Sequence, residues 1–340
     1  PLGYPIVPHV ARDWEVSDDS STWVFHLRKG MKWSDGHPFT AHDIHYWWWF
    51  EFVFGLETGI RMEENGDKVI RHGDTYGSVA VIDDQTVEFK FDAPNPFLLE
   101  KLAGTNLTSI CFPKHYLEKY HPEFGDQELI ENAMQRRGYV SKSQLYMEMK
   151  QEDNPLCPRL TPWINQTYKP NPPYSFVRNP YFWAVDTEGN QLPYIDQVTM
   201  EVQTPELITI DTAAGGYPAT FNRLEFSDYS LFMKGRKTYG YDVLHWYPAV
   251  RSNWTIWPNL NRRTDPGDEI GRMKSELLNT KEFIQALSLA INRKAIIQAE
   301  FNGIGEPAQL SPGRESPFSS ERLHTSFADY DPERADRMLD

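Results

Sequence analysis

The stretch WVFHLRKGMKWSDGHPFTAHD, residues 23–43, decides the fold of the first part of this chain. Its beginning is rich in aromatic and β-branched residues, which predicts a strand over Thr22–Leu27. Segment 33–38 has the Ser, Asp, Gly and Pro residues that favour a tight turn. Thr40 predicts the N-cap of a helix, with Asp43 in the first turn near the positive end of the helix dipole. The stretch therefore predicts a strand–turn–helix unit.

Four consecutive aromatic residues, Trp47, Trp48, Trp49 and Phe50, extend this helix. Consecutive positions point around most of a helix, so no single face can hold all four rings. We expect most of them to lie in the core and one to serve as a ligand platform. We assign Trp48 to the ligand-binding set.

The rest of the chain alternates strand and helix patterns, as expected for an α/β protein. The region of about 121–165 reads as a helical insertion. The other predicted strands are Val79–Ile82, Thr86–Phe91, Tyr174–Val177, Gln197–Val202, Tyr241–Trp246 and Asn253–Trp257. The other predicted helices are a short one at 97–102, one from Thr280, one at Ala295–Phe301 and one from Asp331-Pro332.

Composition excludes several classes of partner. The 340 residues contain 34 Lys and Arg against 48 Asp and Glu, a net charge of −14, which disfavours a nucleic-acid partner. No stretch approaches the roughly 18–20 apolar residues of a membrane helix, and no signal peptide is present at the start. The two cysteines, Cys111 and Cys157, can pair or stay free.

No sequence motif points to catalysis. The chain has no Gly-x-Ser-x-Gly elbow, no phosphate-binding glycine loop and no Cys-x-x-Cys pair. His42 and His45 are spaced like a metal pair, but a third ligand is missing, so we expect solvated histidines. We therefore predict no catalytic residue, no metal and no cofactor. A glycoside hydrolase stays an alternative, since two carboxylates in a cleft would suffice.

The opening stretch closely resembles the signature of the extracellular solute-binding protein family 5, the peptide-binding components of bacterial ABC importers. Four further blocks follow in that family's order. They are 81–87 (VIDDQTV), 178–183 with 192–196 (RNPYFW and LPYID), 283–293 (ending AINR) and 330–335 (YDPERA). The insertion Val185–Gln191 resembles a subgroup that includes oligosaccharide binders. The chain departs from the family pattern at Gly215–Ala219 and Pro172-Pro173.

The resemblance implies a periplasmic-binding-protein-like α/β fold of type II, with two lobes, a hinge and an extra domain. Residues 1–112 would form the extra α/β domain of the first lobe. Residues 113–250 would return to the first lobe and carry the helical insertion. Residues 251–340 would begin a second lobe that is truncated here, because family members run well past this length.

The ligand-facing residues expected from the resemblance lie in the hinge segment that crosses between the lobes. They are Trp246, Tyr247, Arg251, Ser252, Asn253 and Trp254, together with Trp48. The implied function is capture of oligopeptides outside the cytoplasm, as a periplasmic protein or cell-surface lipoprotein, and delivery to a membrane permease by a monomer. Aromatic residues make up 14% of the chain, and this share keeps oligosaccharides open as the ligand.

Overall fold

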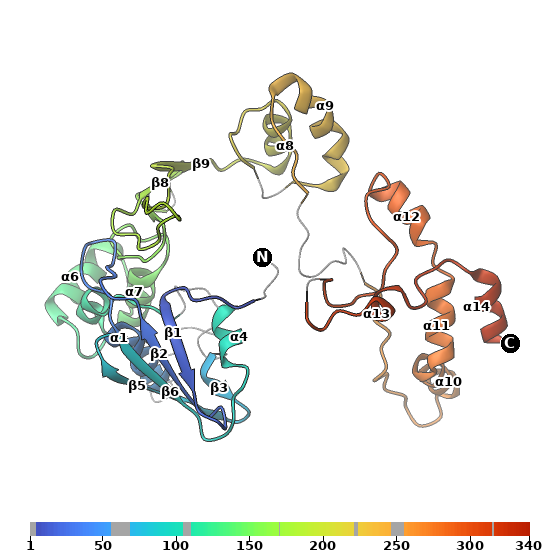
Figure 1. The fold of residues 1–340 in the computed structure, drawn as a ribbon, viewed down its shortest axis with the longest axis horizontal. Coiled ribbons are helices and arrows are strands. Elements are labelled where there is room, and N and C mark those ends of the chain that lie inside the picture. The colour runs from blue at the N-terminus through green and yellow to red at the C-terminus, as the bar shows by residue number, and fades with distance from the viewer. Residues whose placement is uncertain are drawn as a thin grey trace. The chain divides into compact units, whose positions relative to one another are not determined.

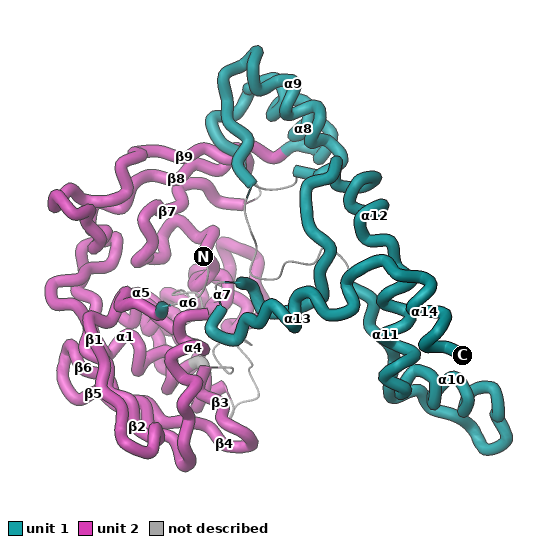
Figure 2. The backbone as a smooth tube through the Cα atoms, turned by 45° about the vertical axis from the view of Figure 1, so that its right-hand side comes forward, with its two compact units in different colours: residues 1–5, 203–340 teal, residues 6–202 magenta. Residues whose placement is uncertain are grey.

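The computed structural model describes residues 5–55, 69–104, 110–169, 171–220, 224–245, 255–314 and 316–340. The chain divides into two compact units, residues 6–202 and residues 203–340 together with 1–5 (Figure 2). Most contacts of each unit are made within that unit, so the two units are described separately. The domain limits expected at 112/113 and 250/251 stay predictions.

An antiparallel sheet of four strands, in the order β1-β2-β6-β5, organises the unit 6–202 (Figure 1). Its strands are β1 (Ala11–Val16), β2 (Thr22–Leu27), β5 (Ser78–Asp83) and β6 (Thr86–Lys90). In the central pair, Trp23 lies opposite Phe89 and Phe25 opposite Val87, and all four side chains are buried. The alternate residues of β2 are only partly buried, so this sheet has one core face and one wetter face. The strand at 22–27 and the hairpin that follows residue 78 are confirmed.

The predicted helix is also confirmed: α1 (Ala41–Tyr46) begins after Thr40 and packs on β5 and β6. It continues as the π-helix η1 (Trp47–Phe54), which the sequence pattern did not indicate. Trp47 and Phe50 are almost completely buried, whereas Trp48 is half-buried and Trp49 is 38% exposed. The aromatic run therefore builds core with two rings and reaches the surface with another.

Helices and a second sheet complete this unit. The helices at Gln127–Arg137 and Lys142–Lys150 confirm the helical insertion predicted at about 121–165. The helices and short elements are β3 (Arg71–His72), β4 (Thr75–Tyr76), α4 (Leu98–Ala103), α5 (Lys114–Leu117), η3 (Glu118–Tyr120), α6 (Gln127–Arg137) and α7 (Lys142–Lys150). The second sheet is antiparallel, in the order β7 (Trp163–Asn165), β8 (Tyr174–Arg178), β9 (Gln197–Met200). One hydrophobic core joins the first sheet to α1, η1, α5, α6 and α7.

The unit 203–340 is helical in its described residues. Its elements are α8 (Pro205–Ala213), η4 (Phe226–Asp228), α9 (Tyr229–Tyr239), α10 (Glu269–Asn279), α11 (Lys281–Leu289), α12 (Arg293–Glu300), α13 (Glu321–Thr325) and α14 (Pro332–Leu339). Helices α11, α12 and α14 match the predicted ones. α11 packs against α14 around a small core of Ala286, Leu289 and Ala335.

Two strand predictions do not hold in this unit. Tyr241–His245 forms no strand, and neither do residues 255–257, while residues 246–254 lie outside the described residues. Alternating apolar residues predict a strand only where a neighbouring strand can pair with them. Leu244 is 77% exposed, and no described strand pairs with its segment.

Within the described ranges, every helix is too short or too polar to cross a bilayer.

Candidate functional site

Six of the seven predicted ligand-binding residues belong to the segment 246–254. Trp246, Tyr247, Arg251, Ser252, Asn253 and Trp254 all lie outside the described residues, so their ligand role stays a prediction. Of the predicted set, the structure places Trp48 alone.

Trp48 is tied to the scaffold. Its indole Nε1 donates a hydrogen bond to the carbonyl oxygen of Gly77, at 3.1 Å, and its ring lies 5.4 Å from that of His45. The hydrogen bond links η1 to the residue just before β5. Because this polar atom already has a protein partner, a ligand would meet the remaining half-exposed ring rather than the indole N–H. Its role in binding is a prediction that this geometry does not test.

An aromatic group on the surface lies next to Trp48 in the sequence. Trp49 has its ring 5.8 Å from Phe124 and 6.2 Å from His121, and Phe124 is 65% exposed. The sequence predicted one ring of the run as a ligand platform and assigned Trp48, whereas Trp49 is the more exposed ring. It gave no signal that Phe124, some 75 residues later, would lie beside it.

The signature residues themselves build the scaffold. Asp43 is 4% exposed, and both of its carboxylate oxygens accept backbone hydrogen bonds, Oδ2 from Thr40 N at 2.9 Å and Oδ1 from Lys114 N at 3.0 Å. Burial raises the pKa of Asp43, although these two hydrogen bonds favour the carboxylate. Asp43 therefore fixes the start of α1 to the start of α5.

Two blocks of the signature, far apart in sequence, meet in space. Gly36 has a φ of +89°, and a Cβ built on it would lie 3.1 Å from the hydroxyl oxygen of Tyr181. The ammonium of Lys32 lies 5.4 Å from the centre of the same tyrosine ring. Asn179 is completely buried; its Nδ2 donates to Thr161 O at 3.0 Å, and its Oδ1 accepts from Tyr181 N at 2.9 Å. Tyr181 thus lies against Lys32 and Gly36, and Asn179 ties the same block to the segment at Thr161.

The Asp186–Gln191 loop closes on itself. Asp186 Oδ1 accepts from the backbone N–H groups of Glu188 at 2.9 Å and Asn190 at 2.8 Å, and Oδ2 accepts from the Asn190 side chain. Tyr194 donates its hydroxyl to the same carboxylate, and these hydrogen bonds lower the pKa of Asp186. A bridge between Val185 and Gln191 closes the base of the loop.

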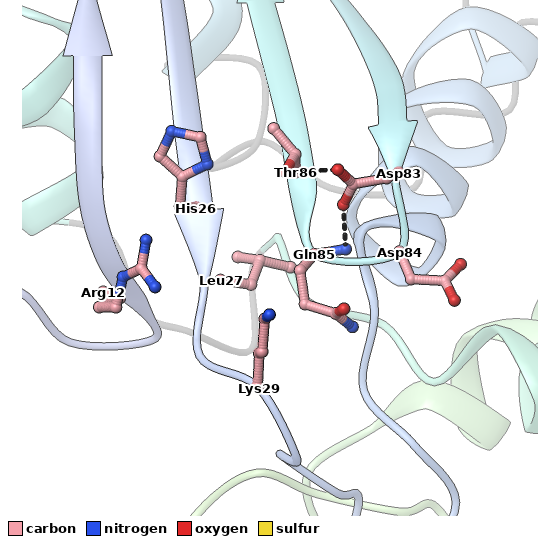
Figure 3. Close-up of a pocket in the computed structure, with 8 residues that line it drawn as sticks. All are labelled: Arg12, His26, Leu27, Lys29, Asp83, Asp84, Gln85 and Thr86. Carbon is pink, nitrogen blue, oxygen red and sulfur yellow. Dashed lines mark hydrogen bonds between the residues drawn. The ribbon is translucent and has the colours of Figure 1, made fainter.

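A polar hollow of about 730 Å³ opens at one end of the first sheet (Figure 3). Arg12, His26 and Lys29 lie on its β1–β2 side, and the β5–β6 turn supplies the acidic side through Asp83 and Asp84. The Asp83 carboxylate accepts from Gln85 N at 2.8 Å and from the Thr86 hydroxyl at 3.0 Å. These bonds, led by that from Gln85, lower the pKa of Asp83. The Asp83 carboxylate thus stabilises the β5–β6 turn and is not suited to act as a proton donor.

The described histidine, cysteine and acidic side chains form no metal site, and both thiols are buried. Across the described ranges, no group of three or more His, Cys, Asp or Glu side chains is arranged to hold a metal ion. His42 instead lies 3.5 Å from Asp84. Cys111 and Cys157 are both free and buried, and burial raises the pKa of each thiol.

Comparison with known families gives a match over nearly the whole chain. Residues 5–340 match the family described as "Bacterial extracellular solute-binding proteins, family 5 Middle". A periplasmic alpha-galactoside-binding protein of Rhizobium meliloti (strain 1021) is 26% identical over 98% of this chain and 45% of its own length. The periplasmic oligopeptide-binding protein OppA of Escherichia coli (strain K12) is 34% identical over 35% of this chain and 22% of its own length.

Solved structures agree with this family. An oligopeptide-binding protein OppA is 35% identical, with a TM-score of 0.79, over 98% of this chain and 51% of that one. The periplasmic binding protein MelB from Agrobacterium fabrum C58, solved with stachyose, is 23% identical, with a TM-score of 0.55, over 98% of this chain and 47% of that one. The chain thus spans about half the length of these two proteins.

Proposed function

Because this chain belongs to the bacterial extracellular solute-binding proteins of family 5, we propose that it captures oligopeptides for an ABC importer. The protein acts by binding and carries out no bond-breaking step. It works outside the cytoplasm, as a monomer in the periplasm or on the cell surface. The bound peptide is handed to the permease subunits in the membrane.

The observation that carries this proposal is the likeness to an oligopeptide-binding protein. The identity of 35% and the TM-score of 0.79 extend over 98% of this chain. The signature contacts around Asp43, Gly36 and Asn179 fit a scaffold that positions a binding site, since each is spent on holding backbone in place.

In the proposed mechanism, an open form admits the ligand and a hinge motion closes the two lobes around it. The segment 246–254 supplies the hinge contacts. Trp246, Tyr247 and Trp254 stack on ligand side chains, and Arg251 pairs with a carboxylate through its planar guanidinium. Ser252 and Asn253 form hydrogen bonds with the peptide backbone. The ring of Trp48 packs against the ligand. A peptide held by its backbone leaves its side chains free to vary, which gives broad specificity.

Oligosaccharides are the second candidate ligand, supported by two of the comparisons. The alpha-galactoside-binding protein covers 98% of this chain, and the MelB structure contains stachyose. The insertion at Val185–Gln191 and the aromatic residues of the hinge segment fit sugar stacking as well as peptide contact. A glycoside hydrolase is the third candidate, and it would need two carboxylates in a ligand-enclosing cleft.

A ligand screen by thermal unfolding decides among these candidates. The protein is mixed separately with tri- to pentapeptides, stachyose, cello- and xylo-oligosaccharides, and nickel. A ligand at 100 times its Kd stabilises the folded state by about 2.7 kcal/mol, which raises Tm by several degrees. We expect the peptides to raise Tm. Stabilisation by a sugar alone would overturn the peptide proposal, and release of shorter sugars over time would overturn both binding proposals.

A pair of variants ties the ligand to the hinge. Arg251→Met should weaken binding of peptides with a free carboxyl terminus by tenfold or more, because it removes the paired cation. Arg262→Met, which changes an exposed arginine outside the hinge segment, should leave affinity unchanged. Equal affinities for both variants by titration calorimetry would remove Arg251 from the site.

A further inference from the structure

Two histidines from distant parts of the chain are stacked face to face in the unit 6–202. His37 belongs to the signature turn, and His115 to α5. Their ring centroids are 3.9 Å apart, and the ring planes differ by only 7°. His115 Nε2 also lies 2.7 Å from Asp35 Oδ2, and His37 Nδ1 lies 3.0 Å from Pro38 O. The stack and the Asp35–His115 contact therefore link the turn to α5 through side chains.

The same turn is held by backbone bonds to a third segment. Ser34 N donates to Arg159 O, and Arg159 N donates to the Ser34 hydroxyl, each at 3.0 Å. Within the turn, Trp33 N donates to His37 O at 2.8 Å. The turn 33–38 is thus a junction between α5, the segment at Arg159 and the block that contains Tyr181.

His115 uses one ring nitrogen for a hydrogen bond, and its second ring nitrogen has no described partner that could accept from it when the ring is protonated. The Nε2–H group donates to Asp35, so a further proton must go to Nδ1. That atom is buried, and it has no hydrogen-bond partner among the residues that the structure describes. A protonated Nδ1 would be a buried donor without an acceptor, which is costly as long as the stack stays closed. Turning the ring toward water would satisfy it but would break the stack.

The surrounding charges compensate one imidazolium and not two. On the turn itself, Asp35 faces His115, and Lys32 covers the Tyr181 ring. From α1, the carboxylate of Asp43 is buried and already occupied by backbone donors. The remaining charged groups nearby are cations: Lys114 on α5, next to His115, and Arg159 beside Ser34. Two stacked imidazolium rings would therefore repel each other, because a single carboxylate, that of Asp35, compensates only one of the two positive charges.

We propose that the His37–His115 pair is an acid-sensitive latch, in which protonation of the stacked imidazoles separates the turn 33–38 from α5. At neutral pH the rings stack and the junction is closed. When both rings are protonated the latch opens, because the stack then carries two positive charges. The opening is local, because the core side chains of the first sheet carry no part of the stack.

Hydrogen exchange measured by mass spectrometry tests the latch. The reporters are the amides of segment 33–39, among them those of Trp33, Ser34 and Phe39, which donate to His37, Arg159 and Met31. Exchange is followed at pH 7.5 and pH 5.0 and divided by the intrinsic rate at each pH. We expect the local opening constant of the wild type to rise at least tenfold on acidification, which corresponds to about 1.4 kcal/mol.

The variants remove the two charges while keeping the contacts. His37→Phe keeps a ring in the stack, and His115→Gln keeps an amide donor for Asp35. The double variant should show no rise on acidification, and each single variant a smaller rise than the wild type. His42→Gln, which changes an exposed histidine outside the stack, should behave as the wild type.

Three results would overturn the proposal. The first is a wild-type opening constant that does not change between the two pH values. The second is a double variant that opens in acid as much as the wild type. The third is an equal rise in the amides of β2 and β6, because it would mean that the whole unit loosens rather than the turn. The proposal does not depend on the ligand, so it can fail while the proposed function stands.

Discussion

Replacing His121 should weaken the pH dependence of the unfolding free energy. This residue follows η3 and is 2% exposed. Its Nδ1 accepts hydrogen bonds from the backbone N–H groups of Glu123 and Phe124, both at 3.1 Å. Its ring centroid lies 3.9 Å from that of Phe50. The ring is thus folded in its neutral form, because a protonated Nδ1 could no longer accept from these two donors.

The magnitude follows from the pKa of this group in the two states. Burial lowers the pKa of His121 from 6.5 to about 4 in the folded protein. Between these values the unfolded chain binds more protons, so the folded state loses stability as the pH falls. Well above pH 6.5, His121 is neutral in both states and the unfolding free energy is not reduced by its titration. It is reduced by about 2 kcal/mol at pH 5 and by about 3 kcal/mol at pH 4.

Urea unfolding followed by tryptophan fluorescence at pH 7, 6, 5 and 4 provides the test. Asn at this position can still accept from the two N–H groups, but it does not titrate. His121→Asn should be less stable at pH 7, because it loses the contact with Phe50. Its stability should then fall by about 3 kcal/mol less than the wild type down to pH 4. The matched control is His42→Asn, an exposed histidine, which should follow the wild-type curve. Parallel losses in the wild type and His121→Asn would refute the reasoning.

Three further predictions concern stability and reactivity. Asp43→Asn should cost about 1–3 kcal/mol in urea unfolding at pH 7, since an amide offers one acceptor where the carboxylate uses two; an unchanged midpoint would contradict this. Gly36→Ala and Gly30→Ala both place a Cβ at positive φ, but Gly36→Ala should cost more, because its Cβ also meets Tyr181; equal Tm values would show that this contact is unimportant. Burial raises the pKa of Cys157 to about 11, so this thiol should react with a disulfide reagent at pH 8 only after unfolding. A fast reaction of Cys157 in the native protein, mapped by mass spectrometry, would disprove its burial.

Local sequence signals predicted the elements that depend on near neighbours. Thr40 and Asp43 mark the beginning of α1, and the Asp-Asp turn marks the β5–β6 hairpin, because caps and turns are settled within a few residues. The prediction that most rings of the aromatic run after Tyr46 lie in the core holds for Trp47 and Phe50, whereas Trp48 is half-buried and Trp49 is exposed. The sequence pattern does not indicate the π-helical form of this run.

Contacts between distant residues had no such signal. Nothing in the sequence pairs His37 with His115, or Gly36 with Tyr181, because those contacts arise only when separate elements pack. Tyr241–His245 shows the opposite error, in which an apolar pattern suggested a strand that has no partner strand. Of the binding site, the family blocks predicted the scaffold, whereas the ligand contacts of 246–254 remain predictions.

The self-closed loop at Asp186 has a practical use in protein engineering. Its shape is held by the Asp186 carboxylate and by the bridge from Val185 to Gln191, and the Gln191 side chain ties its base to the carbonyl oxygens of Pro180 and Phe182. Gly189 lies at its tip with a φ of +87° and open space around it. A fluorophore attached at the neighbouring exposed position, through Glu188→Cys, should be carried on the surface without disturbing β8 or β9, because the loop uses only the backbone N–H of Glu188. The loop thus offers an attachment point for following the movement of this protein in solution.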